Sequence, residues 1–77
     1  MSPIELLIIL DKLREGRTIT FTEVFGSGLE IYRKFQFNGN DIDVVATYNI
    51  NKFKMEYKVT IFEFVKINES HKFKVEG

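Results

Sequence analysis

The apolar positions near the start of the chain follow the spacing of a helix, and they predict one from Ser2 to Gly16. Ser2 and Glu5 have the spacing of a capping box, and Pro3 suits the first helical position because its nitrogen carries no hydrogen. Gly16 can adopt the left-handed conformation that ends a helix. With about 100° between successive residues, one stripe should face the core of the domain: Leu6, Ile9, Leu10 and Leu13.

Three further apolar residues lie on a second flank of this helix: Ile4, Leu7 and Ile8. A small domain does not ordinarily leave such a flank in water, so we expect the flank to contact a partner. Association through one twofold-related patch is the commonest arrangement among soluble oligomers. The flank can be covered only by a wrap of the fifth strand or by another molecule, and of these it favours a homodimer.

The rest of the chain alternates between apolar and polar residues, which is the two-residue period of a β-strand. Turn-forming residues separate the alternating segments, and Asn38-Gly39 is a hairpin signal because both residues tolerate positive φ. The alternation predicts the strands Arg17–Phe25, Leu29–Phe37, Asn40–Asn49, Lys52–Ile67 and, as a short fifth strand, His71–Glu76.

Two features conflict with perfectly regular strands. Phe62 and Phe64 have the opposite parity from the apolar residues before them, so the fourth strand is expected to bend or bulge near Ile61. Arg33 and Glu63 take inward parity among apolar neighbours, where a charge must be paired. The two could meet across the sheet, Arg33 could reach a partner carboxylate from an edge, or a bulge could turn each outward.

These elements predict a single α+β domain over residues 1–77, with one N-terminal helix packed on an antiparallel meander sheet of four to five strands. A helix of about 13 residues is only ~20 Å long, so it cannot cover the whole sheet, and the remainder must curl or dimerise. The face of the sheet away from the helix is expected to be polar, with Tyr32 exposed on it.

The composition narrows the classes of function. The chain has no cysteine, which excludes a disulfide framework and a thiolate zinc site and favours the cytoplasm. The apolar run from Ile4 to Leu10 is far shorter than the ~20 residues that span a bilayer, so we expect no membrane insertion. Eleven basic residues balance eleven acidic ones, which gives no long-range attraction for nucleic acid.

Few residues suggest chemistry. His71 is the only histidine, and its neighbours Ser70 and Glu69 adjoin it on a turn rather than facing it as a triad requires. Asp41 and Asp43 alternate as calcium ligands can, but the distal glutamate of a calcium loop is missing, and a polar hairpin explains them better. We therefore assign no catalytic, cofactor-binding or metal-binding residue.

The sequence predicts a small non-enzymatic protein–protein interaction module that acts as a homodimer. Its isoleucine, lysine, asparagine and phenylalanine content is typical of low-GC genomes, which suits an accessory or inhibitor protein of bacteria or phages. The alternative is a nucleic-acid-binding protein that uses residues 52–77, where six basic residues outnumber four acidic ones. The expected interface residues are Ile4, Leu7, Ile8, Arg33 and Tyr32.

Overall fold

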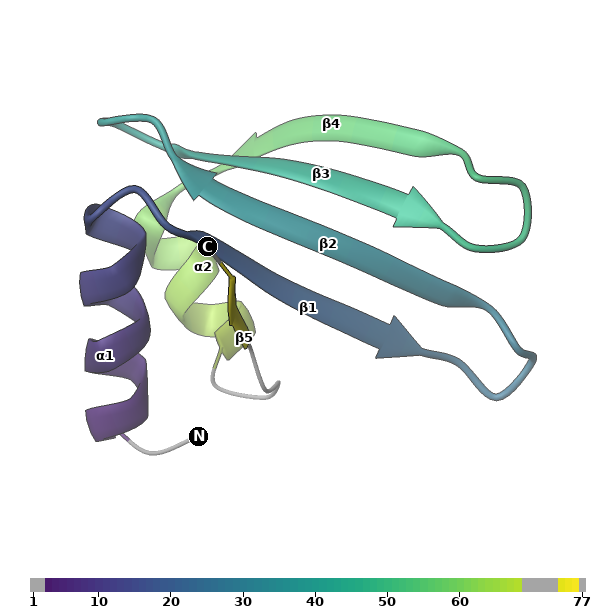
Figure 1. Ribbon diagram of the computed structural model, residues 1–77, viewed down its shortest axis with the longest axis horizontal. Helices are drawn as coiled ribbons and strands as arrows, with labels where there is room; N and C mark the ends of the chain where they lie inside the picture. Colours follow the sequence, from purple (N-terminus) through teal and green to yellow (C-terminus); the bar gives the residue numbers. More distant parts are fainter. Residues whose placement is uncertain (1–2, 69–73, 77) are drawn as a thin grey trace.

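The computed structural model describes residues 3–68 and 74–76. Its five strands form one antiparallel sheet in the order β4-β3-β2-β1-β5, and two helices lie against one end of this sheet (Figure 1). The α+β class and the meander of the first four strands are confirmed. In chain order the elements are α1 (Pro3–Arg14), β1 (Thr18–Val24), β2 (Glu30–Phe37), β3 (Ile42–Tyr48), β4 (Lys54–Val59), α2 (Ile61–Asn68) and β5 (Lys74–Glu76).

α1 ends as its sequence predicts. The amide of Gly16 donates to the Leu13 carbonyl at 3.0 Å and the amide of Arg17 donates to the Lys12 carbonyl at 3.1 Å, while Gly16 has a φ of 91°. This pair of bonds is the Schellman motif that satisfies the last carbonyls of a helix. Ile9 and Leu13 are buried, which confirms the predicted core stripe, and Leu6 and Leu10 at its sides are half-buried. Ser2, the expected cap, lies outside the described residues.

The register of the sheet confirms the predicted apolar and polar faces. Ile19, Phe35 and Val44 lie side by side on β1, β2 and β3 and are buried on the face toward the helices, which we call the inner face. On the opposite, outer face, Tyr32 lies between Thr22 and Thr47 in the neighbouring strands. β1, β2 and β3 therefore divide their side chains between a core face and a more polar face, as the period of two requires.

The prediction of one long strand over Lys52–Ile67 is wrong, because β4 stops at Val59 and α2 follows. Thr60 and Glu63 form a capping box: the Glu63 amide donates to the Thr60 hydroxyl at 3.1 Å, and the Thr60 amide donates to the Glu63 carboxylate at 3.4 Å. The parity conflict at Phe64 marks a change of period from two to 3.6, not a bulge. Phe64 is fully buried, and its ring meets that of Phe35 edge-on with centroids 5.2 Å apart.

β5 does not continue the meander beside β4. It pairs antiparallel with Thr18–Thr20 at the start of β1, on the opposite edge of the sheet, and α2 carries the chain between the two edges (Figure 1). The predicted fifth strand over His71–Glu76 is confirmed for Lys74–Glu76. Residues 71–73 of that prediction lie outside the described residues.

The core occupies only one end of the inner face. Both helices pack there, whereas the β1–β2 and β3–β4 hairpins project beyond them (Figure 1). As expected, the short α1 does not cover the whole sheet. α2 packs at the same end of the sheet as α1 and leaves the other end without a helix (Figure 1). The buried residues that form this core are Ile9, Leu13, Ile19, Phe35, Ile42, Val44, Val59 and Phe64.

Candidate interaction surface

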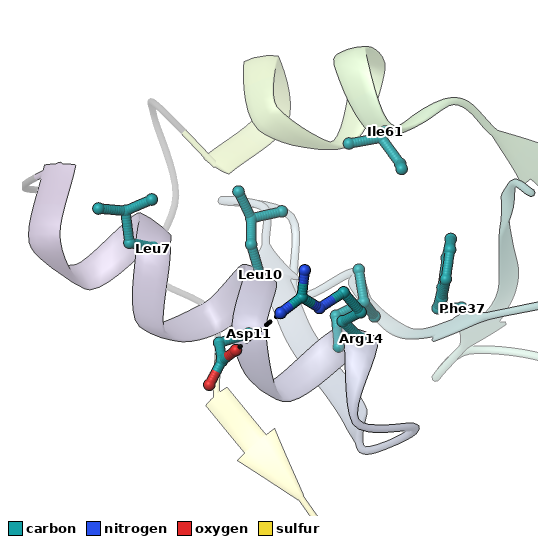
Figure 2. Close-up of a pocket in the computed structure, with 7 residues that line it drawn as sticks. Leu7, Leu10, Asp11, Arg14, Phe37 and Ile61 are labelled. Carbon is teal, nitrogen blue, oxygen red and sulfur yellow. Dashed lines mark ion pairs between the residues drawn. The ribbon is translucent and has the colours of Figure 1, made fainter. Parts of the chain in front are cut away.

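An apolar groove of about 320 Å³ lies between the two helices. Leu10 points from α1 toward α2, and Ile61 of α2 and Phe37 of β2 lie on the other side of the gap (Figure 2). Because its contributors come from three elements, the groove exists only in the folded chain. Its full lining is Leu7, Leu10, Asp11, Leu13, Arg14, Phe37 and Ile61.

The local sequence explains why these side chains meet. Leu7, Leu10 and Arg14 follow one another at intervals of three and four residues, so they lie along one side of α1. Ile61 is the first residue of α2, and the capping box at Thr60 fixes where that helix begins. Phe37 ends β2 at the edge of the core. The groove was not predicted, because it depends on α2.

Leu7 of the second flank of α1 lines this groove, and all three residues of the flank are exposed. The exposed fractions are 70% for Ile4, 66% for Leu7 and 52% for Ile8, and Ile61 across the groove is 44% exposed. We call these four residues the helix surface. Large aliphatic side chains gathered in this way are typical of a contact site, whereas single exposed ones are normal.

The charged groups beside the groove contribute little energy of their own. Arg14 and Asp11 pair one helical turn apart at 3.7 Å, and both side chains are exposed. Exposed pairs of this kind contribute roughly 0–1 kcal/mol, because water screens them and both side chains lose freedom. The pair therefore leaves the apolar groove as the dominant feature of this end of the molecule.

Arg33 is half-buried on the inner face and is paired within the chain. Its guanidinium donates to the Glu23 carboxylate of β1 at 2.8 Å. Burial disfavours the charged guanidinium, but hydrogen bonds to Glu23 and Tyr57 outweigh that effect, so the pKa of Arg33 is raised above its ordinary value. Ala46 lies opposite Arg33 on β3, and its small side chain leaves room on this face.

The alternatives considered for Arg33 and Glu63 are therefore wrong. The two do not meet across the sheet, since Glu63 lies in α2 and caps it through Thr60. Arg33 does not reach out from an edge, because β2 is flanked on both sides by strands. No outward bulge is needed either, because Glu23 supplies the partner. The assignment of Arg33 to the expected interface remains a prediction.

Tyr32, the other strand residue of the expected interface, lies on the outer face. The Lys34 ammonium lies 5.9 Å from the centre of its ring. Charges of both signs share this face: Lys58 lies directly opposite Asp43, and Lys34 shares a cross-strand row with Glu56. This mixture makes no continuous basic stripe on the described strands, so it gives the nucleic-acid alternative no support.

The acidic hairpin residues have turn-forming roles. The Asn38 side chain accepts hydrogen bonds from the amides of Asn40 and Asp41 at 3.0 and 2.9 Å, and it donates to Asp43 at 3.1 Å. Over residues 3–68 and 74–76, no group of three or more acidic or histidine side chains is arranged to hold a metal ion. His71, Ser70 and Glu69 lie outside the described residues.

Comparison of the chain with protein-family models, with curated proteins and with solved structures gives no match. Within the described part of the chain, neither helix has the length and apolar character needed to cross a bilayer.

Proposed function

We propose that this chain is a non-enzymatic protein–protein interaction module that acts as a homodimer through the helix surface. The observation that carries the proposal is the exposure of Ile4, Leu7 and Ile8 on α1, where Leu7 also lines an apolar groove of about 320 Å³. Leaving such side chains in water is unfavourable, by roughly 1.5–3 kcal/mol for each one that a partner could bury completely.

A second copy is a suitable occupant because the helix surface combines a recess with projecting side chains. In an isologous contact the same patch serves both molecules, so it must supply both shapes. Here the groove, which Leu7 lines, is the recess, and the exposed Ile4 and Ile8 are projecting side chains of the same helix. Set against the cost of association, the burial of these residues suits a weak or moderate dimer.

A non-enzymatic role is supported by the structural roles of the acidic side chains that could otherwise have been candidates for catalysis. Asp43 is held by Asn38 in a turn, Glu63 caps α2, and Glu23 neutralises Arg33. A cysteine-free chain suits the reducing cytoplasm. We extend the proposal to an accessory or inhibitor protein of bacteria or phages, on the composition of the chain.

Sedimentation equilibrium at several concentrations tests the proposal. Leu7→Glu places a charge beside the groove, so it should shift the chain toward smaller species while leaving the far-UV circular dichroism unchanged. Ile50→Glu is the matched control, because Ile50 is 71% exposed and lies in the β3–β4 turn, away from both helices. Equal behaviour of wild type, Leu7→Glu and Ile50→Glu up to about 0.5 mM, far above the micromolar scale of an ~8 kcal/mol contact, would overturn it.

A further inference from the structure

β4 forms one edge of the sheet, and the side of its backbone away from β3 has no strand partner among the described residues. Its side chains alternate. Met55 and Tyr57 lie on the inner face and are 43% and 37% exposed. The outer face of the strand carries charges in the order positive, negative, positive, at Lys54, Glu56 and Lys58. An open edge with an apolar face can pair with another strand, and its charges decide which one.

We propose that β4 pairs antiparallel with β4 of a second copy, across a twofold axis that passes beside Tyr57. In this register Glu56 of each copy lies opposite Lys58 of the other, so two ion pairs form on the outer face. On the inner face Met55 lies opposite Val59 of the other copy, and the two Tyr57 side chains are neighbours. Five of the six residues of β4 are paired.

The charged side chains of β4 disfavour the registers in which the twofold axis passes beside a neighbouring residue. With the axis at Glu56, two glutamates would face each other and Lys54 would lie opposite Lys58, so every pair on the outer face would be repulsive. With the axis at Lys58, two lysines would face each other. An axis at Met55 would make a favourable Lys54–Glu56 contact, but it would pair only three residues of β4 with each other. Tyr57 is therefore the axis that joins opposite charges over most of the strand.

A twofold axis normal to the sheet keeps the helices of both copies on the same side, so the two inner faces become one. The partly exposed Met55 and Tyr57 of both copies lie together on this shared face. This contact rests on β4 alone and does not require the helix surface. A chain with two distinct isologous contacts assembles beyond a dimer, and dihedral tetramers, the next commonest symmetry after twofold dimers, are built in this way.

Cysteine crosslinking tests the register directly, because the chain has no cysteine of its own. Directly opposite residues in an antiparallel pair have Cα atoms about 4.5–5.5 Å apart, which a disulfide can bridge. Tyr57→Cys should therefore form a disulfide-linked dimer in a redox buffer. Met55→Cys is the matched control, on the same strand and face with similar exposure, but about 13 Å from its copy in this register. Equal yields from the two variants would overturn the proposal.

Charge reversal supplies the second arm, carried out in the Tyr57→Cys chain. Lys58→Glu and Glu56→Lys each place like charges opposite one another at both symmetric positions, so each alone should lower the crosslinking equilibrium about tenfold. Mixing the two variants restores opposite signs at both positions. The mixed disulfide should therefore form in clear excess over the 1:2:1 ratio that random pairing gives, and that random ratio would overturn the register.

The test separates this contact from the helix surface. Leu7→Glu should leave the Tyr57→Cys crosslinking yield unchanged, while the β4 charge variants should leave the effect of Leu7→Glu on sedimentation unchanged. If crosslinking fails while Leu7→Glu still shifts sedimentation, only the proposed β4 contact is ruled out. If crosslinking succeeds while Leu7→Glu has no effect on sedimentation, only the proposed contact through the helix surface is ruled out.

Discussion

Phe64 offers the sharpest test of how α2 completes the core. Its ring is fully buried against Phe35, with centroids 5.2 Å apart, at the point where both helices meet the sheet. Truncating a fully buried phenylalanine to alanine costs about 3–5 kcal/mol, through lost burial and the cavity left behind. A domain of this size is stable by only about 3–5 kcal/mol. We therefore expect Phe64→Ala to be largely unfolded at 25 °C.

Phe62→Ala is the matched control, because Phe62 lies two residues away in the same helix and is 67% exposed. Its truncation should change the free energy of unfolding by no more than about 0.5 kcal/mol, as surface substitutions usually do. Urea titrations followed by far-UV circular dichroism compare the two. At about 1 kcal/mol per molar urea, Phe64→Ala should lose at least about 3 M in midpoint. Adding an osmolyte such as trimethylamine N-oxide stabilises the folded state, so that the unfolding transition of the less stable Phe64→Ala variant can be measured.

The comparison also separates a helix from a strand at this position. On a strand, residues two apart share a face, so Phe62 and Phe64 would lose similar amounts of stability. On a helix they lie about 200° apart, and only one faces the core. Similar midpoints for Phe62→Ala and Phe64→Ala would therefore refute α2 and the packing described for it.

Two further predictions concern polar contacts. Thr60→Ala should lower the free energy of unfolding by about 1 kcal/mol, because it removes the hydroxyl that accepts from the Glu63 amide; thermal unfolding measures the loss. Glu23→Gln should cost about 1 kcal/mol by leaving the half-buried Arg33 without its anion, and the double variant with Arg33→Met should recover part of that loss in a double-mutant cycle.

Most of the fold was predictable because local signals and periodicity agreed. Gly16 marked the end of α1, and the alternation around Phe35 and Val44 placed the buried face of the sheet correctly. These signals need no knowledge of distant contacts. The pairing of β5 with β1 was not predictable in the same way, because a three-residue strand carries almost no pattern and its place depends on where α2 delivers the chain.

α2 could have been found from sequence. Thr60 and Glu63 have the same capping-box spacing that marked the start of α1, directly before a run of apolar residues. The strand-like alternation before Val59 favoured continuing the strand over starting a helix at this capping box, since short apolar runs are ambiguous between strand and helix. The partner of Arg33 was harder to predict. Glu23 of β1 is the diagonal cross-strand neighbour of Arg33 of β2, and only the register of the two strands brings these side chains together.

The position of α2 explains why the two surfaces for which we propose association stay uncovered in this small domain. Had α2 packed on the projecting end of the sheet, it would have covered the inner face near Met55 and Tyr57. It packs beside α1 instead, so Phe64 completes a deep core at one end, while the groove between the helices stays open and Met55 and Tyr57 stay partly exposed. Stability is thus concentrated at one end of the sheet. The exposed apolar residues on the helix surface and along β4 become favourable only when another molecule covers them.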